Sequence, residues 1–134
     1  MLLPMQTLEE LNQEFAIPSI ARFDAAQGGS IRLNITAPGG EAHIYLHGAH
    51  LAHYQPAGEK PLLYLSPQSS FEPGKAIRGG VPVIFPWFGP RPTGPGPMHG
   101  MVRTRLWDVQ SGRQDGEAVL VTIVFSSSAE PRQT

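Results

Sequence analysis

Two short motifs in this sequence combine a cationic side chain with glycine and could bind a small anion. The first is Arg78-Gly79-Gly80, and the second is the segment HGMVR at 99–103. A guanidinium presents planar donors that match a phosphate or a carboxylate. Glycine lets the backbone approach a ligand because it has no Cβ atom. These residue types predict a pocket for a small anion.

The segment between the motifs must position them. Residues 81–88 predict a buried strand, because most of their side chains are apolar. The loop that follows is rich in proline, with prolines at 86, 90, 92, 95 and 97. Proline fixes φ and reduces the entropy lost when a loop becomes ordered. A long loop that is stiffened in this way is typical of a functional segment.

Short strands joined by glycine and proline turns are expected elsewhere. Apolar and polar residues alternate over 31–37, which predicts a half-buried strand. Further strands are expected over 41–46, 49–55, 62–65, 104–110 and 119–125, with a turn at 112–116. Strands at this spacing indicate an all-β sandwich or barrel.

A short helix is expected before the strands. Thr7 and Glu10 form the capping-box pattern, so the sequence predicts a helix over 8–15. Leu8, Leu11 and Phe15 then share one stripe, and Pro18 disfavours helix at the residue before it.

Composition excludes several classes of protein. The net charge of −1 gives no broad basic surface for nucleic acid or an anionic membrane. The absence of cysteine excludes disulfides and thiolate metal sites. No apolar run is long enough for a membrane span, and residues 1–6 do not resemble a secretory signal. A cytoplasmic protein is therefore expected, without nucleic-acid or membrane partners.

The central stretch carries a family resemblance. The segments KAIRGGVP at 75–82, FPWFG at 85–89 and HGMVR at 99–103 occur in order. Together they resemble the hexose-6-phosphate mutarotases, also called glucose-6-phosphate 1-epimerases, of the aldose 1-epimerase superfamily. The resemblance extends more weakly from about Phe23 to Phe125. It covers only the first half of such an enzyme.

The resemblance implies a fold. It indicates an all-β protein that is part of a galactose-mutarotase-like β-sandwich, or supersandwich, with a short N-terminal helix. Residues 1–17 are then expected to form a helical appendage, and residues 18–134 the N-terminal part of the sandwich domain. The predicted strand at 119–125 is apolar on both faces, so it should be central in a sheet. Few residues follow it, and we therefore expect the domain to be truncated.

The resemblance also implies roles for site residues. Arg78 and Arg103 match the arginines that clamp the sugar 6-phosphate, and His99 matches a histidine that lines the sugar site. The alternatives are surface arginines or internal ion pairs, and a structural hydrogen bond for the histidine. Lys75 could add positive potential or be an ordinary exposed lysine. Trp87 could form a wall under the sugar ring or pack in the core.

The implied activity is interconversion of the α and β anomers of a hexose 6-phosphate such as glucose 6-phosphate. This reaction needs a base at O1 and an acid at O5, and no cofactor. The family's catalytic glutamate and histidine belong to the second half, so no catalytic residue is expected here. They are expected beyond Thr134, and this chain alone should be inactive. The alternative is a non-catalytic sugar-phosphate-binding β-sandwich module.

A group of histidines invites a metal-site hypothesis. His43, His47, His50 and His53 lie close in sequence, but the break at Gly48 makes their convergence unclear. No carboxylate has matching spacing, so no metal is expected.

Overall fold

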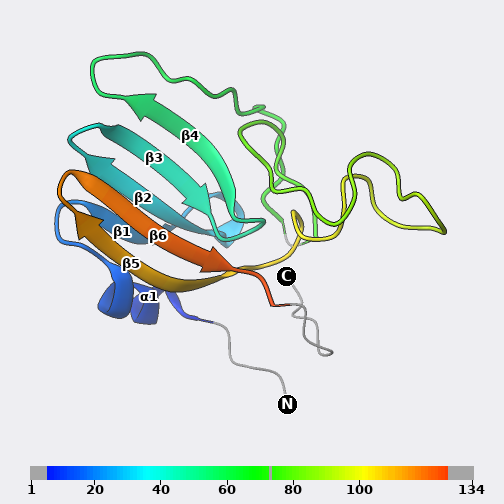
Figure 1. Ribbon diagram of the computed structural model, residues 1–134, viewed down its shortest axis with the longest axis horizontal. Coiled ribbons are helices and arrows are strands. Elements are labelled where there is room, and N and C mark those ends of the chain that lie inside the picture. The colour runs from blue at the N-terminus through cyan, green and yellow to red at the C-terminus, as the bar shows by residue number, and fades with distance from the viewer. Residues whose placement is uncertain (1–5, 73, 127–134) are drawn as a thin grey trace.

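The computed structural model describes residues 6–72 and 74–126 of the 134-residue chain. Within these ranges the regular elements are one α-helix, one turn of 3-10 helix and six strands (Figure 1). Their bounds are α1 Leu8–Phe15, β1 Ala21–Ala25, η1 Gln27–Gly29, β2 Ile31–Ala37, β3 Gly40–Tyr45, β4 His50–Pro56, β5 Asp108–Asp115 and β6 Ala118–Val124. The expectation of an all-β protein with a short N-terminal helix is confirmed.

Helix α1 begins where the capping box predicts. The Thr7 hydroxyl accepts from the Glu10 backbone N–H at 3.1 Å, and the Glu10 carboxylate accepts from the Thr7 N–H at 3.0 Å. These bonds satisfy amides that a helix start leaves unpaired. The predicted apolar stripe faces the core, where Leu11 is fully buried.

Four strands form one antiparallel sheet in the order β1-β2-β3-β4. Strand β2 has the predicted bounds, and β3 and β4 each lie within one residue of the expected ranges. Strand β1 was not expected, because it has only five residues and their alternation is short. A register shift interrupts the β3–β4 ladder between His43 and Ile44.

Strands β5 and β6 form a separate antiparallel hairpin. The prediction for β6 is confirmed to within one residue, but the prediction for β5 is wrong at both ends. Residues 103–104 form a turn, and Leu106 makes only an isolated bridge to His47, in which the Gly48 N–H donates to the Arg105 carbonyl at 2.8 Å. The ladder then continues through Gly112 to Asp115, so the hairpin turn begins later than expected.

The core lies between the sheet, the hairpin and α1. The buried residues of this cluster come from α1, β1, β2, the residue after β3, and β5, and they are Leu11, Ala21, Phe23, Leu33, Leu46 and Val109. Helix α1 lies beside both β1 and β5 (Figure 1). Burial of this apolar surface is the main force that joins the two sheets.

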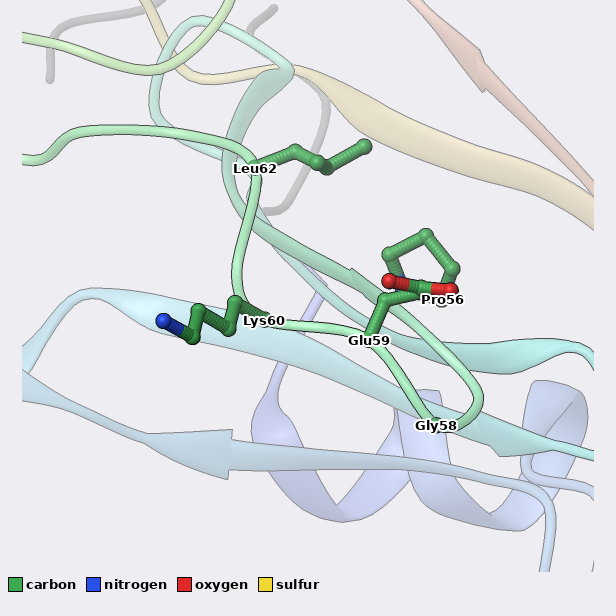
Figure 2. A pocket seen from close by; sticks show the side chains of 5 residues that line it. All are labelled: Pro56, Gly58, Glu59, Lys60 and Leu62. Atoms are coloured by element: carbon green, nitrogen blue, oxygen red, sulfur yellow. The ribbon is translucent and has the colours of Figure 1, made fainter.

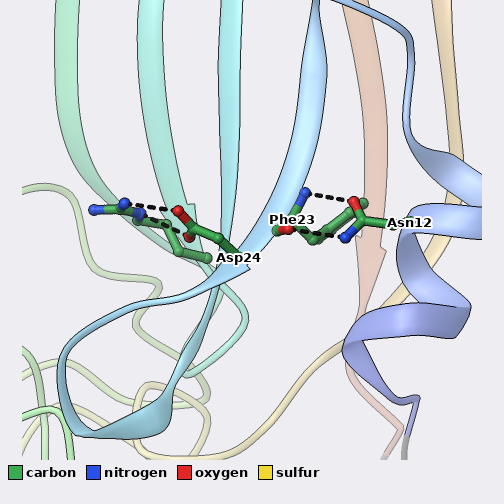
Figure 3. Close-up of polar contacts among 4 residues, drawn as sticks. Asn12, Phe23 and Asp24 are labelled. Atoms are coloured by element: carbon green, nitrogen blue, oxygen red, sulfur yellow. Dashed lines mark hydrogen bonds and ion pairs between the residues drawn. The ribbon is translucent and has the colours of Figure 1, made fainter.

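Two carboxamides reinforce that junction. The Asn12 side chain donates to the Phe23 carbonyl at 2.9 Å and accepts from the Phe23 N–H at 2.8 Å (Figure 3). Gln6 makes the same pair of bonds to Val109, at 3.0 and 2.9 Å. Each side chain therefore satisfies both backbone groups of one strand residue. Across the sheet, Arg32 and Asp24 form a two-pronged ion pair (Figure 3).

The structure corrects two strand predictions between β4 and β5. Residues 62–65 and 81–88 form only isolated bridges, at Leu65, Val81 and Phe85. Pro82 and Pro86 lack the N–H that a ladder needs. The predicted burial is also wrong, since Phe85 is 65% and Phe88 79% exposed. This part of the chain extends to one side of the sheets as loops (Figure 1).

The expectation of a central position for the last strand is not met within the described residues, where β6 pairs only with β5. Its side chains alternate between exposed and half-buried, with Leu120 exposed. No helix in the described part of the chain is long and apolar enough to cross a membrane.

Candidate functional site

Both sequence motifs converge on the turn that joins β3 to β4. The His47 and His50 rings each donate from Nε2 to a carbonyl of the first motif region, those of Lys75 and Gly79 respectively. The backbone of the same turn bonds the second region, since Gly48 donates to the Arg105 carbonyl at 2.8 Å. One turn of the sheet therefore positions two segments that are distant in sequence.

The backbone of the first motif is held from both sides. The Gly80 N–H donates to the Tyr64 carbonyl and the Val81 N–H to the Leu51 carbonyl, each at 2.8 Å. Gly79 has φ of 101°, and a Cβ there would collide with the Tyr64 carbonyl. The motif needs glycine at this position because the chain passes against another backbone with positive φ.

Arg78 presents its side chain to solvent while its backbone is anchored. The Arg78 N–H donates to the Ser69 hydroxyl at 3.1 Å, and that hydroxyl donates to the Arg78 carbonyl at 2.7 Å. Within the described ranges no carboxylate forms an ion pair with its guanidinium. The alternative of an internal ion pair for Arg78 therefore finds no support in this part of the chain.

The backbone of the second motif lies against the backbone of Phe85, within the segment 81–88. Gly100 has φ of 81°, and a Cβ there would collide with the Phe85 carbonyl. That carbonyl accepts from the Met101 N–H at 2.8 Å. The close approach of these two backbones fixes the position from which Arg103 projects.

Arg103 is half-buried and incompletely paired. Its Nη2 donates to the Met98 carbonyl at 3.2 Å, but its buried Nε has no hydrogen-bond partner among the described residues. Burial, and then the charge of Arg78, lower the pKa of the Arg103 guanidinium. Two cations thus lie within electrostatic reach of each other. In the described chain no ion pair offsets either charge, which favours an anion as their shared partner.

His99 has a defined orientation beside this pair of arginines. Its ring Nδ1 accepts from the Gly89 N–H at 2.9 Å, and the His99 backbone N–H donates to the Gly89 carbonyl at 2.8 Å. Because Nδ1 accepts, the neutral ring carries its proton on Nε2. The ring also packs against Phe88, with centroids 4.8 Å apart. The imidazole is therefore held with an Nε2–H donor that can serve a ligand oxygen.

Lys75 and Trp87 are both engaged locally. The Lys75 ammonium pairs with Glu72 at 3.1 Å, and both side chains are exposed. Trp87 donates from Nε1 to the Pro97 carbonyl at 2.9 Å, and the Arg91 guanidinium lies over its ring at 5.1 Å. Lys75 is therefore an exposed lysine with a local acidic partner, and Trp87 packs within the proline-rich loop.

The histidine group divides into two pairs. His43 and His53 pack ring to ring with centroids 4.6 Å apart, and His53 bonds Glu41 at 3.0 Å. His47 and His50 are buried at the other end of the strands. Among the described residues, no three histidine, aspartate, glutamate or cysteine side chains gather as a metal-binding group. Only the metal hypothesis had singled out His50, whose contact with the first motif depends on tertiary structure.

One hollow of the described chain lies away from these residues. It has a volume of about 650 Å³ and is lined by residues of the turn after β4, namely Pro56, Gly58, Glu59, Lys60 and Leu62 (Figure 2). None of these is a candidate site residue. Arg78, Arg103 and His99 stay the candidate site, because they combine two cations without a carboxylate partner in the described chain with an oriented imidazole.

The sequence is similar to known proteins over most of its length. The family model described as aldose 1-epimerase matches residues 32–132. The chain is 42% identical over 93 residues to an Escherichia coli K12 protein named "Putative glucose-6-phosphate 1-epimerase", covering 69% of this chain and 32% of that protein. A Salmonella typhimurium LT2 protein of the same name is 39% identical over 93 residues, with the same coverage.

A solved structure shares the fold. A crystal structure of a "putative mutarotase" from Salmonella typhimurium superposes on this chain with a TM-score of 0.79 at 31% identity. The match covers 86% of this chain and 39% of that chain. The fold prediction of part of a mutarotase β-sandwich is thereby confirmed. The matched region spans about a third of the length of the curated relatives. The family match covers most of the sequence, and the chain belongs to the aldose 1-epimerase family.

Proposed function

We propose that this chain supplies phosphate and sugar recognition for the interconversion of α and β anomers of a hexose 6-phosphate, such as glucose 6-phosphate. The observation that carries the proposal is the pairing of Arg78 with Arg103 across two motifs. The charge of one affects the other, and no carboxylate of the described chain is paired with either. A phosphate dianion would neutralise both guanidiniums with charge-assisted hydrogen bonds.

His99 would bind the sugar rather than the phosphate. Its Nε2–H is free of the bonds that hold the ring, which use Nδ1 and the backbone. A neutral imidazole N–H suits a sugar hydroxyl or ring oxygen. Lys75 would add positive potential from the rim, and Trp87 would support the loop from which the site is built.

The reaction needs a proton acceptor at O1 and a proton donor at O5. Ring opening, rotation about C1–C2 and closure then exchange the anomers, and the two groups exchange roles for the closing step. The proposed site offers guanidiniums and one imidazole. We therefore place the catalytic pair outside this chain's described residues and expect little exchange activity from this chain alone.

A further polypeptide segment is the proposed partner. In this proposal residues 18–134 form the N-terminal part of the sandwich domain, and residues 1–17 attach to it through the buried Leu11. The support is the exposed apolar surface beside the site, which includes Tyr64 at 72%, Phe85 and Phe88. Large exposed apolar patches mark surfaces that a partner covers. The cytoplasmic location stays a prediction.

Calorimetric titration with glucose 6-phosphate and with glucose tests the recognition proposal. Arg78→Ala should weaken glucose 6-phosphate binding by roughly 1.5–3 kcal/mol, the scale of a hydrogen bond to a charged group, and leave glucose binding unchanged. Arg113→Ala is the matched control, because Arg113 is an exposed arginine on β5 that pairs with Asp115 at 3.8 Å. Equal affinity in Arg78→Ala and wild type would refute the proposal.

Anomer exchange measured by NMR tests the catalytic part. The rate with glucose 6-phosphate should rise only with a polypeptide that carries the additional segment of the longer relatives. Exchange by this chain alone would show that the acid and base lie within it. Binding without exchange by any longer product would favour the non-catalytic sugar-phosphate module.

A further inference from the structure

His50 lies at the point where the two motifs meet. It is the first residue of β4, and its side chain is 1% exposed. Its Nε2 donates to the Gly79 carbonyl, and the ring packs against Gly80, where a Cβ would come within 3.1 Å of Nε2. The imidazole therefore lies directly under the glycines of the first motif.

The other nitrogen of this ring is unpaired. Among the described residues, the buried polar side-chain atoms that have no hydrogen-bond partner are His50 Nδ1 and Arg103 Nε. The first is an acceptor, because the bond to Gly79 places the proton on Nε2, and the second is a donor. A buried donor and a buried acceptor that stay unpaired each cost stability, so a rearrangement that pairs them with each other would be favourable.

The two groups are close enough to affect each other. Burial lowers the pKa of His50; the bond to Gly79 opposes this shift, and the nearby His47 and Arg103 add to it. A neutral ring is the form whose Nδ1 can accept from a guanidinium. The Arg103 carbonyl also lies against Gly48, two residues before His50.

We propose that His50 is a positioning residue for Arg103, whose Nε–H it accepts at Nδ1 when an anion binds between Arg78 and Arg103. The inference rests on the proposed function, since it concerns the same anion site. In this arrangement the ring donates to the Gly79 carbonyl and accepts from the Arg103 guanidinium. The positions of the two motifs then depend on each other through His50. Catalytic hydrogen bonds that are long in a free protein commonly tighten on binding.

Binding of glucose 6-phosphate to four variants tests the inference. His50→Leu removes both ring bonds and should weaken binding roughly tenfold, the scale of one charge-assisted hydrogen bond. His50→Gln keeps an amide donor and an acceptor and should recover most of that loss. His47→Leu and His47→Gln are the matched controls, because His47 is 4% exposed and bonds the Lys75 carbonyl in the same way.

A spectroscopic measurement separates positioning from stability. In the free wild-type chain, 15N NMR should show His50 as the neutral Nε2–H tautomer. Its Nδ1 resonance should move upfield on addition of glucose 6-phosphate, as a nitrogen does when it begins to accept a hydrogen bond. A purely structural histidine would keep its Nδ1 resonance, and an Nδ1–H tautomer would overturn the inference.

The two proposals fail in different ways. If Arg78→Ala and Arg103→Ala leave binding unchanged, the anion site itself is wrong. If both weaken binding but His50→Leu matches His47→Leu at equal folded fraction, the anion site stands and the role of His50 is refuted. No gain of His50→Gln over His50→Leu would refute it as well.

Discussion

Mild acid should destabilise this protein through its two buried histidines. His47 and His50 are 4% and 1% exposed. Burial lowers the pKa of each imidazole below its usual value of 6.5, although the hydrogen bonds to the Lys75 and Gly79 carbonyls oppose this. The unfolded chain therefore binds more protons than the folded one just below pH 6.5, and the free energy of unfolding falls as pH falls through that value.

The magnitude follows from the linkage of protonation to folding. A histidine that titrates at 6.5 in the unfolded state and stays neutral in the folded state contributes about 1.4 kcal/mol of lost stability between pH 7.5 and pH 5.5. If both rings stay neutral down to pH 5.5, the pair contributes about 2.7 kcal/mol, which is the upper bound of the effect. This is a large fraction of the stability of a small domain. The Asp24 pKa is lowered by Arg32, so loss of that pair belongs to more acidic pH.

Urea unfolding at pH 7.5, 6.5 and 5.5 measures this effect. His47→Gln and His50→Gln each keep an N–H for the loop carbonyl but remove the titration, so each should remove about half of the predicted pH dependence. The half-buried His43, whose pKa is also lowered by burial, remains in every variant and cancels in the comparison. The reasoning is refuted if the double variant has the same pH dependence as the wild type.

Three substitutions test the packing around the core and the site by the same unfolding assay. Leu11→Ala should cost about 2–5 kcal/mol, because the side chain is fully buried in the core shared by both sheets; a cost near that of the exposed control Leu62→Ala would contradict this. Asn12→Ala should cost about 1–3 kcal/mol, because it leaves both backbone groups of Phe23 unpaired; no change would show that other groups satisfy them. Gly100→Ala should cost at least about 1–2 kcal/mol from its positive φ alone, besides the collision with the Phe85 carbonyl; Gly94→Ala, whose added Cβ meets no atom at a similar φ, separates the two effects.

Local patterns predicted the elements that depend on local interactions. Helix α1 and strand β2 have the predicted bounds, since a capping box and a strict alternation are read within one element. The family resemblance was equally local, because it rests on glycines and arginines in fixed order. All three glycines of the two motifs, Gly79, Gly80 and Gly100, have positive φ, and a Cβ at each would collide with a neighbouring backbone.

Predictions failed where burial depends on distant segments. The apolar residues at 81–88 suggested a buried strand, yet Phe85 is exposed and the prolines prevent a ladder. Strand β5 begins later than its apolar pattern indicated, because the turn at Gly48 holds the chain near Arg105 by its backbone. The contact at Gly48 leaves no signal in the residues of β5 itself, whereas Pro82 and Pro86 are a local signal against a ladder within 81–88.

The sequence alone determined the all-β class, the helix and the two motifs, because residue type, spacing and backbone freedom are properties of short segments. Only the tertiary structure decided that Arg78 and Arg103 lie near each other and that His50 is buried under Gly79. The physical reason is that the β3–β4 turn satisfies buried polar groups of both segments at once. A hydrogen bond between residues distant in the chain is specified by the packing of the whole domain, and no local pattern encodes it.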